Sequence, residues 1–240
     1  MISSIRRFAQ WLVFLLLTFV VSLALSWVVL AKVDFAYPLL HDYAGLGDNI
    51  TQYAPRNAVR PGFDQTTREE RARLFHGIVE SIQHQGQGLT ALRYHDRNGQ
   101  PLNTLLTEAE VVHLQDVANL LDTVTTASLG ALILWLILLV VLLYYRQALP
   151  GARQLLLGLL GMGLVLAAVL SFGATEVFYQ LHIWIFPEGH QWFFYYEESL
   201  MSMMMKAPVL FAYIAAMLVG LAVVISLGLL WGYRLVAEHY

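Results

Sequence analysis

Four long apolar runs without a charged side chain divide this chain of 240 residues. They cover residues 11–31, 123–145, 155–175 and 208–233. Each run has at least 21 residues, and a helix of that length rises about 31 Å, enough to cross a hydrocarbon core about 30 Å thick. The pattern predicts an α-helical integral membrane protein with four transmembrane helices.

The first run follows Arg6 and Arg7, as the apolar region of a signal peptide follows its basic residues. Signal peptides, however, have shorter apolar regions of about 7–15 residues. A retained membrane anchor is therefore predicted, although Ala24 or Ala31 lies where a cleavage site is possible.

Basic residues next to the runs indicate how the chain crosses the membrane, because Lys and Arg collect on the cytoplasmic side. They precede the first run, flank the turn between the second and third, and follow the fourth: Arg6, Arg7, Arg146, Arg153 and Arg234. Both termini are therefore predicted to be cytoplasmic. The predicted parts are the N-terminus with the first span (1–32), an extracytoplasmic cap (33–122), the second and third spans (123–175), an interfacial loop (176–207), and the fourth span with the C-terminus (208–240).

The cap is predicted to be a small α+β structure. Irregular or short-stranded structure is predicted over residues 33–63, because glycines and prolines separate its short apolar pieces. A helix should then begin near Thr66 or Thr67 and end at the glycines of residues 86–88. Its apolar residues recur at a spacing of four: Leu74, Ile78 and Ile82. Next, Asn98-Gly99 predicts a hairpin, because this pair accepts the positive φ values of a tight turn.

A capping box formed by Thr107 and Glu110 predicts a second helix, which runs toward the second span. One of its faces is apolar: Val111, Leu114, Val117 or Ala118, and Leu121. Another face carries Glu110, His113 and Asp116, and residues three apart are neighbours on a helix. Either carboxylate is placed to accept a hydrogen bond from one nitrogen of this imidazole and to fix its tautomer.

An aromatic strip, LHIWIFPEGHQWFFYY (residues 181–196), follows the third run closely. It contains His182 and His190, and its Pro-Glu-Gly sequence predicts a turn, because proline and glycine end helices. Trp and Tyr prefer the headgroup level of a membrane. The strip is therefore predicted to lie at the outer interface, where the ester bonds of lipids are found. His190 remains open between a surface role and a functional one.

Composition narrows the classes of function. The chain is 58% hydrophobic and 13% charged, with a mean hydropathy of +0.59, outside the range of ordinary soluble domains. The predicted cap holds twelve acidic and seven basic residues, which argues against a nucleic-acid partner. The sequence has no cysteine, so disulfides and thiol chemistry are excluded.

Two segments carry a resemblance to a known family. EAEVVHLQDVANLL resembles the Glu-x-x-His-Met-x-Asp-Val-Lys element of the lipoprotein intramolecular transacylases, and LHIWIFPEGHQWFF resembles their Phe-His-x-x-Phe-Phe-Pro-x-Gly-x-Trp-x-Phe element. The four-span layout with one large outer segment is also similar, so the resemblance covers nearly the whole chain. Three departures are compatible with a divergent branch: Leu114 in place of Met, the longer Gly–Trp spacing created by His190-Gln191, and the run MSMMMKAPVLF before the last span.

The resemblance implies a reaction and its residues. The family moves the sn-2 acyl chain of a diacylglyceryl-modified N-terminal cysteine onto the α-amino group of that cysteine, which leaves a lyso-form lipoprotein. It implies His113 and His182 as the reactive pair, diacylated bacterial lipoproteins and membrane lipid as partners, and neither cofactor nor metal. It also implies the bacterial cytoplasmic membrane, with the active site on the extracytoplasmic face. The candidate supporting or substrate-binding residues are Asp116, Glu110, Glu188 and Trp192.

Two other classes remain open. A zinc-dependent membrane hydrolase is one alternative, with His113, His182 and Asp116 as ligands, although the sequence has no H-E-x-x-H motif. The other is a non-enzymatic accessory or sensor protein of the cell envelope, whose acidic cap binds a partner.

Overall fold

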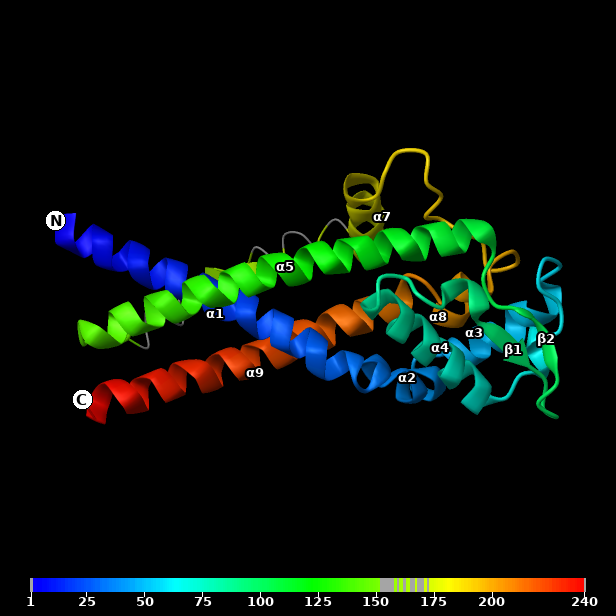
Figure 1. Ribbon diagram of the computed structural model, residues 1–240, viewed down its shortest axis with the longest axis horizontal. Coiled ribbons are helices and arrows are strands. Elements are labelled where there is room, and N and C mark those ends of the chain that lie inside the picture. Colours follow the sequence, from blue (N-terminus) through cyan, green and yellow to red (C-terminus); the bar gives the residue numbers. More distant parts are fainter. Residues whose placement is uncertain are drawn as a thin grey trace. The chain divides into compact units, whose positions relative to one another are not determined.

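The computed structural model describes residues 2–151, 158, 160, 161, 163, 164, 167, 171 and 173–239. The described chain is mostly helical, with one two-stranded sheet (Figure 1). It divides into two compact units. The first unit comprises Met1–Val29, Thr125–Val177 and Ala216–Tyr240, and the second comprises Leu30–Val124 and Phe178–Ala215.

Within the described residues, three helices are long and apolar enough to cross a membrane: α1 (Ile2–Ala31), α5 (Glu108–Tyr144) and α9 (Val209–His239). They confirm three of the four predicted spans as helices. The other predicted span, residues 155–175, lies largely outside the described residues. The 37 residues of α5 rise about 55 Å, which exceeds the membrane core. The four acidic residues of α5 all precede residue 123, and the rest of the helix is apolar.

Aromatic rings and hydroxyls hold the helices of the first unit together. The Phe14 and Trp135 rings are stacked, with centroids 5.9 Å apart. The Trp135 indole donates a hydrogen bond of 2.8 Å to Thr18 Oγ1. One turn further along α1, Ser22 Oγ lies 2.9 Å from Ser226 Oγ of α9. Small residues and hydroxyls of this kind let membrane helices approach closely and satisfy each other's polar groups.

The first part of the second unit corrects a prediction. Instead of irregular or short-stranded structure, residues 33–63 form two short α-helices, α2 (Tyr37–Tyr43) and α3 (Leu46–Tyr53). The same segment also contains 3₁₀ turns: η1 (Asp34–Ala36), η2 (Ala54–Arg56) and the start of η3 (Phe63–Gln65). Pro38 lies in the first turn of α2, where proline is tolerated, and Gly45, with φ of +72°, precedes α3. These residues therefore mark where helices begin.

The other predicted elements of this segment, a helix, a hairpin and a second capped helix, are present, although the first helix ends at Gln83, before the predicted glycines. Helix α4 (Arg68–Gln83) begins after Thr67, whose side chain accepts a hydrogen bond from the Glu70 amide. Strands β1 (Arg93–His95) and β2 (Pro101–Thr104) pair antiparallel after the 3₁₀ turn η4 (Leu89–Ala91). Gly99 in their turn has φ of +76°. The capping box of α5 is also present, since the Thr107 amide donates to Glu110 Oε2 at 2.6 Å.

The aromatic strip forms the end of one helix and a loop. Helix α7 (Ala174–Ile185) stops before the predicted Pro-Glu-Gly turn, in which Gly189 has φ of +86°. A loop then leads to α8 (Leu200–Met205). This short helix is buried and contacts α3, where Asn49 Nδ2 donates a hydrogen bond of 2.8 Å to the Met203 carbonyl. The methionine run is thus packing for the second unit.

Candidate active site

Two histidines that are far apart in the chain meet in the second unit. The His113 ring, from α5, and the His182 ring, from α7, have centroids 5.9 Å apart and planes inclined by 30°. The two rings are therefore neighbours although they lie 69 positions apart in the sequence.

His182 has a fixed tautomer. Its Nδ1 lies 2.7 Å from the carbonyl oxygen of Phe178, one turn earlier in α7. A carbonyl oxygen only accepts hydrogen bonds, so Nδ1 carries the proton. In the neutral ring, Nε2 is then the nitrogen with the free lone pair, and this atom can accept a proton.

His113 is buried, with 8% of its surface exposed. Within the described residues its ring nitrogens make no hydrogen bond, and both are available to a bound molecule. It precedes the apolar part of α5, which begins at residue 123. Burial, and after it the neighbouring His182 ring, lowers the pKa of His113 from 6.5 to about 4, while the Asp116 carboxylate raises it.

The pKa of His182 is also lowered, chiefly by burial, while its bond to the Phe178 carbonyl acts in the opposite direction. Both imidazoles are therefore neutral at pH 7.

Aromatic side chains surround the two imidazoles. Phe186, which follows α7, contacts both rings, with centroids 4.9 Å from His113 and 5.2 Å from His182. Phe194 lies 6.0 Å from His113, and Trp192 lies 5.1 Å from His182. The site is thus a pair of neutral bases inside an apolar wall.

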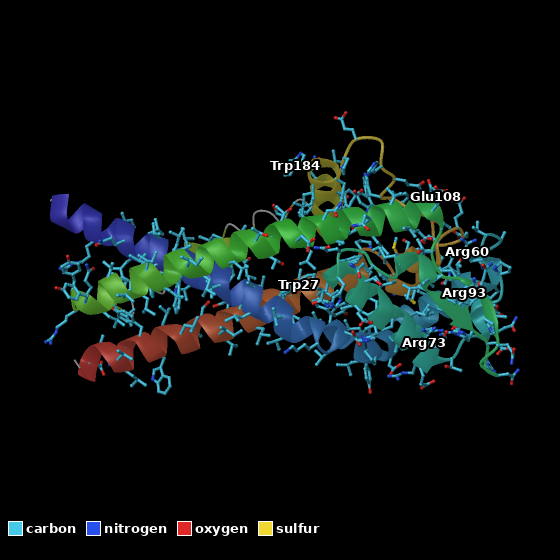
Figure 2. All side chains as sticks on the ribbon, viewed as in Figure 1. Trp27, Arg60, Arg73, Arg93, Glu108 and Trp184 are labelled. Carbon is cyan, nitrogen blue, oxygen red and sulfur yellow. The ribbon has the colours of Figure 1, made fainter. Side chains whose placement is uncertain are left out.

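The aromatic strip has two roles. Trp192, predicted as an interfacial anchor or a contact of the site, is half-buried against His182. Trp184, by contrast, is 73% exposed on α7 (Figure 2). Tyr195 is also exposed. Only part of the strip is therefore free to contact a membrane surface, while the rest forms the wall of the site.

The two predicted orienting carboxylates have other partners. Asp116 Oδ2 accepts a hydrogen bond of 2.7 Å from His190 Nδ1. Glu110 is fully buried, and its carboxylate accepts bonds from the Thr107 amide and, at 2.5 Å, from the Ser199 hydroxyl. In the described part of the chain neither is hydrogen-bonded to His113. Glu110 instead joins the start of α5 to the residue that caps α8.

Glu188 and the alternative zinc site are the remaining candidates from the sequence. Glu188 is exposed in the turn, and its carboxylate makes no ion pair with any residue that the structure describes. Across the same residues, no group of three His, Asp or Glu side chains is arranged to hold a metal ion. His113, His182 and Asp116, the ligands of the alternative zinc site, are therefore not arranged as a metal site among these residues.

Sequence patterns left two features of the site unassigned. The Phe178 carbonyl fixes the tautomer of His182, and its position four residues earlier on the same helix is the signal that was available. The pairing of His190 with Asp116 had no local signal, because it joins residues of different elements.

Comparison with known proteins gives two matches. The family model described as lipoprotein intramolecular transacylase Lit matches residues 8–208. Among solved structures, the chain is similar to the membrane integral lipoprotein intramolecular transacylase Lit from Bacillus cereus, determined in meso with one histidine replaced by arginine. The two share 15% identity over 98% of this chain and 95% of that one, with a TM-score of 0.63, a likeness of fold. No curated protein matches this chain.

Proposed function

Because the chain belongs to the family of the lipoprotein intramolecular transacylase Lit, we propose that it moves the sn-2 acyl chain of a diacylglyceryl-cysteine lipoprotein to the α-amino group of the same cysteine. The observation that carries this proposal is the approach of two neutral imidazoles, His113 and His182, to 5.9 Å inside an aromatic wall. The product is a lyso-form lipoprotein with an N-acyl chain.

The reaction exchanges one bond for another. The amine nitrogen forms a bond to the acyl carbonyl carbon, and the bond from that carbon to the sn-2 oxygen breaks. The amine loses one proton and the sn-2 oxygen gains one, so no proton is consumed overall. Amine and ester belong to one molecule, and their proximity removes much of the entropic cost of bringing two reactants together. No nucleophile from the protein is needed.

His182 suits the proton transfer. An α-amino group has a pKa of about 7.7–8.0, so its ammonium form first releases one proton to solvent, and the neutral amine attacks. With Nδ1 bonded to the Phe178 carbonyl, Nε2 of His182 is the free base that takes the next proton from the nitrogen as the bond to the acyl carbon forms. The same atom then returns it to the departing sn-2 oxygen. Acid–base groups placed in this way typically contribute about 10²–10⁴-fold in rate.

His113 suits the second role. The tetrahedral intermediate carries a negative oxygen, which is stabilised by a hydrogen-bond donor already in place. The N–H of a neutral His113, free of other partners within the described residues, is such a donor. The wall formed by Phe186, Phe194 and Trp192 keeps water away. Water would compete with the amine for the ester.

The test is expression in bacteria that make diacylated lipoproteins and lack such a transfer, followed by tandem mass spectrometry of a lipoprotein N-terminal peptide. Intramolecular transfer leaves the mass of the lipopeptide unchanged but places the acyl chain in the fragment that contains the amine. Hydrolysis would instead remove one acyl chain, and an accessory protein would leave the peptide unaltered. Either of these results from the wild-type chain would refute the proposal.

Variants then test the site. His113→Ala and His182→Ala should each lower the transfer rate by about 10²-fold or more. His84→Ala is the matched control, because His84 is an exposed histidine whose ring bonds only the Glu80 carbonyl of its own helix, at 2.8 Å. Equal rates in all three variants would show that the two imidazoles do not carry the reaction.

A further inference from the structure

A third histidine borders the site without contacting the reactive rings. His190 Nδ1 donates a hydrogen bond of 2.7 Å to Asp116 Oδ2. The Asp116 side chain is only 13% exposed, while that of His190 is 42% exposed. Asp116 lies three residues after His113, so it occupies the neighbouring position on the same face of α5.

This pair, here called the clasp, joins α5 to the loop of residues 186–194, whose aromatic side chains contact the two reactive rings. His190 ends a turn in which its amide donates a hydrogen bond of 3.2 Å to the Pro187 carbonyl. Phe186 precedes that turn, and Trp192 and Phe194 follow it. Among the described residues, this side-chain link from the turn to α5 therefore has Phe186 on one side in the sequence and Trp192 and Phe194 on the other, and all three contact the reactive rings.

The clasp coincides with a departure from the family pattern. In that pattern one residue separates the glycine from the tryptophan, whereas here His190-Gln191 separates Gly189 from Trp192. An additional loop residue has additional conformations to lose when the loop becomes ordered. A side-chain bond from the inserted segment to α5 offsets this cost where the loop must keep one conformation.

We propose that His190 is a positioning residue: its bond to Asp116 holds the aromatic loop over the two imidazoles and keeps the Asp116 carboxylate from bonding His113. The effect of the clasp on catalysis rests on the proposed function. Its effects on the position of the loop and on the titration of His113 do not depend on that function.

The effect of the clasp on His113 follows from the groups that face this ring. They are His182 of α7 and Asp116 of its own helix, and the other ring neighbours, Phe186 and Phe194, carry no charge. With His190 present, the carboxylate has a partner of its own. Without it, Asp116 is free to accept a hydrogen bond from His113 and would favour its charged form. A charged His113 is a poor match for a site that must receive an ammonium group.

Four variants separate positioning from general stability. His190→Ala removes the clasp, and His190→Asn keeps a donor close to the position of Nδ1. Asp116→Asn removes the carboxylate. His76→Ala is the matched control, since His76 forms a similar pair with Asp34 Oδ1, at 2.9 Å, on α4 of the same unit.

Two measurements are made on each full-length variant. The first is the kcat and KM of acyl transfer on a synthetic diacylated lipopeptide in lipid vesicles. The second is the pH titration of the His113 ring by NMR of protein labelled with ¹³C at histidine Cε1, with the signal assigned from its loss in His113→Gln. This second measurement needs no activity.

His190→Ala should lower kcat by up to about 10²-fold, with a smaller change in KM, and should raise the midpoint of His113 above the value near 4. His190→Asn should restore both. Asp116→Asn should lower the midpoint of His113. The His190→Ala and Asp116→Asn variants would thus shift this midpoint in opposite directions, although each breaks the same bond, which a purely structural role would not produce. His76→Ala should match the wild type.

The inference is overturned if His190→Ala leaves kcat and the His113 midpoint unchanged, or if His190→Asn does not restore them. If the wild type catalyses no acyl transfer, the proposed function fails, and the titration alone decides whether the clasp acts on His113.

Discussion

Glu110 supplies a sharp test of how the site is held together. Its carboxylate is fully buried and accepts three hydrogen bonds: from the Thr107 amide at 2.6 Å, the Ser199 hydroxyl at 2.5 Å and the Met201 amide at 3.4 Å. These bonds cap α5 and connect it to the start of α8. Glu110→Ala therefore removes a helix cap and leaves a buried hydroxyl without its partner.

The expected loss of stability follows from the surroundings of each donor. Thr107 is half-buried, so water replaces part of its bond, and loss of the cap costs about 1 kcal/mol. Ser199 is 1% exposed, and although its oxygen still accepts a bond from the Ser202 amide, a buried O–H left without an acceptor costs about 2 kcal/mol. The free energy of unfolding should fall by about 3 kcal/mol, which corresponds to a decrease of about 6–12 °C in Tm for a chain of this size.

A thermal melt of the purified protein in one detergent, followed by tryptophan fluorescence, measures this change. Glu108→Ala is the control, because Glu108 lies on the same turn of α5 but is exposed (Figure 2). It should lose less than about 1 kcal/mol, from the weaker helix dipole interaction alone. If the two variants melt at the same temperature, the buried carboxylate does not connect α5 and α8 in the way argued above.

Two further predictions concern other parts of the chain. The lowered pKa of His113, about 4 against 6.5, means that the unfolded state takes up its proton first, so stability should fall by up to about 3 kcal/mol between pH 6.5 and pH 4. Melts over this pH range should show the decline, and His113→Gln should flatten it. In the first unit, Thr18→Val should cost about 0.6 kcal/mol, and Trp135→Phe should cost more, because it also removes part of a buried ring that stacks on Phe14. The double variant should lose less than the sum of the two, because both remove the same 2.8 Å bond. Additive losses in that cycle would argue against the bond as a source of stability.

The sequence predicted features that depend on neighbouring residues. The capping box of Thr107 and Glu110, the turn at Gly99 and the end of α7 before Pro187 are set within a few residues, and each is present. The long apolar runs were equally readable, because a membrane helix is defined by length and composition. Local chemistry was sufficient for these elements.

Features that depend on distant partners were not predictable. The helices of residues 33–63 differ from the prediction, because glycines and prolines such as Gly45 and Pro55 indicate breaks in the sequence, while the buried contacts that stabilise α2 and α3 come from elsewhere in the chain. Asn49, for example, bonds the Met203 carbonyl of α8. The partner of Asp116 was not predictable for the same reason. Helical spacing predicts His113 as the partner, but Asp116 is hydrogen-bonded to His190, a residue of another element.

The properties of the two imidazoles suit acyl transfer within one molecule better than hydrolysis. The helix that carries His182 also fixes its tautomer, through the Phe178 carbonyl, so the base needs no further partner. Burial by aromatic rings keeps both histidines neutral at pH 7, which prevents repulsion of a protonated substrate amine. In the proposed reaction, these apolar rings would disfavour water, the nucleophile that would turn transfer into hydrolysis. The proposed reaction thus requires a defined position of the loop between Phe186 and Phe194, because the loop residues Phe186, Trp192 and Phe194 contact the two imidazoles.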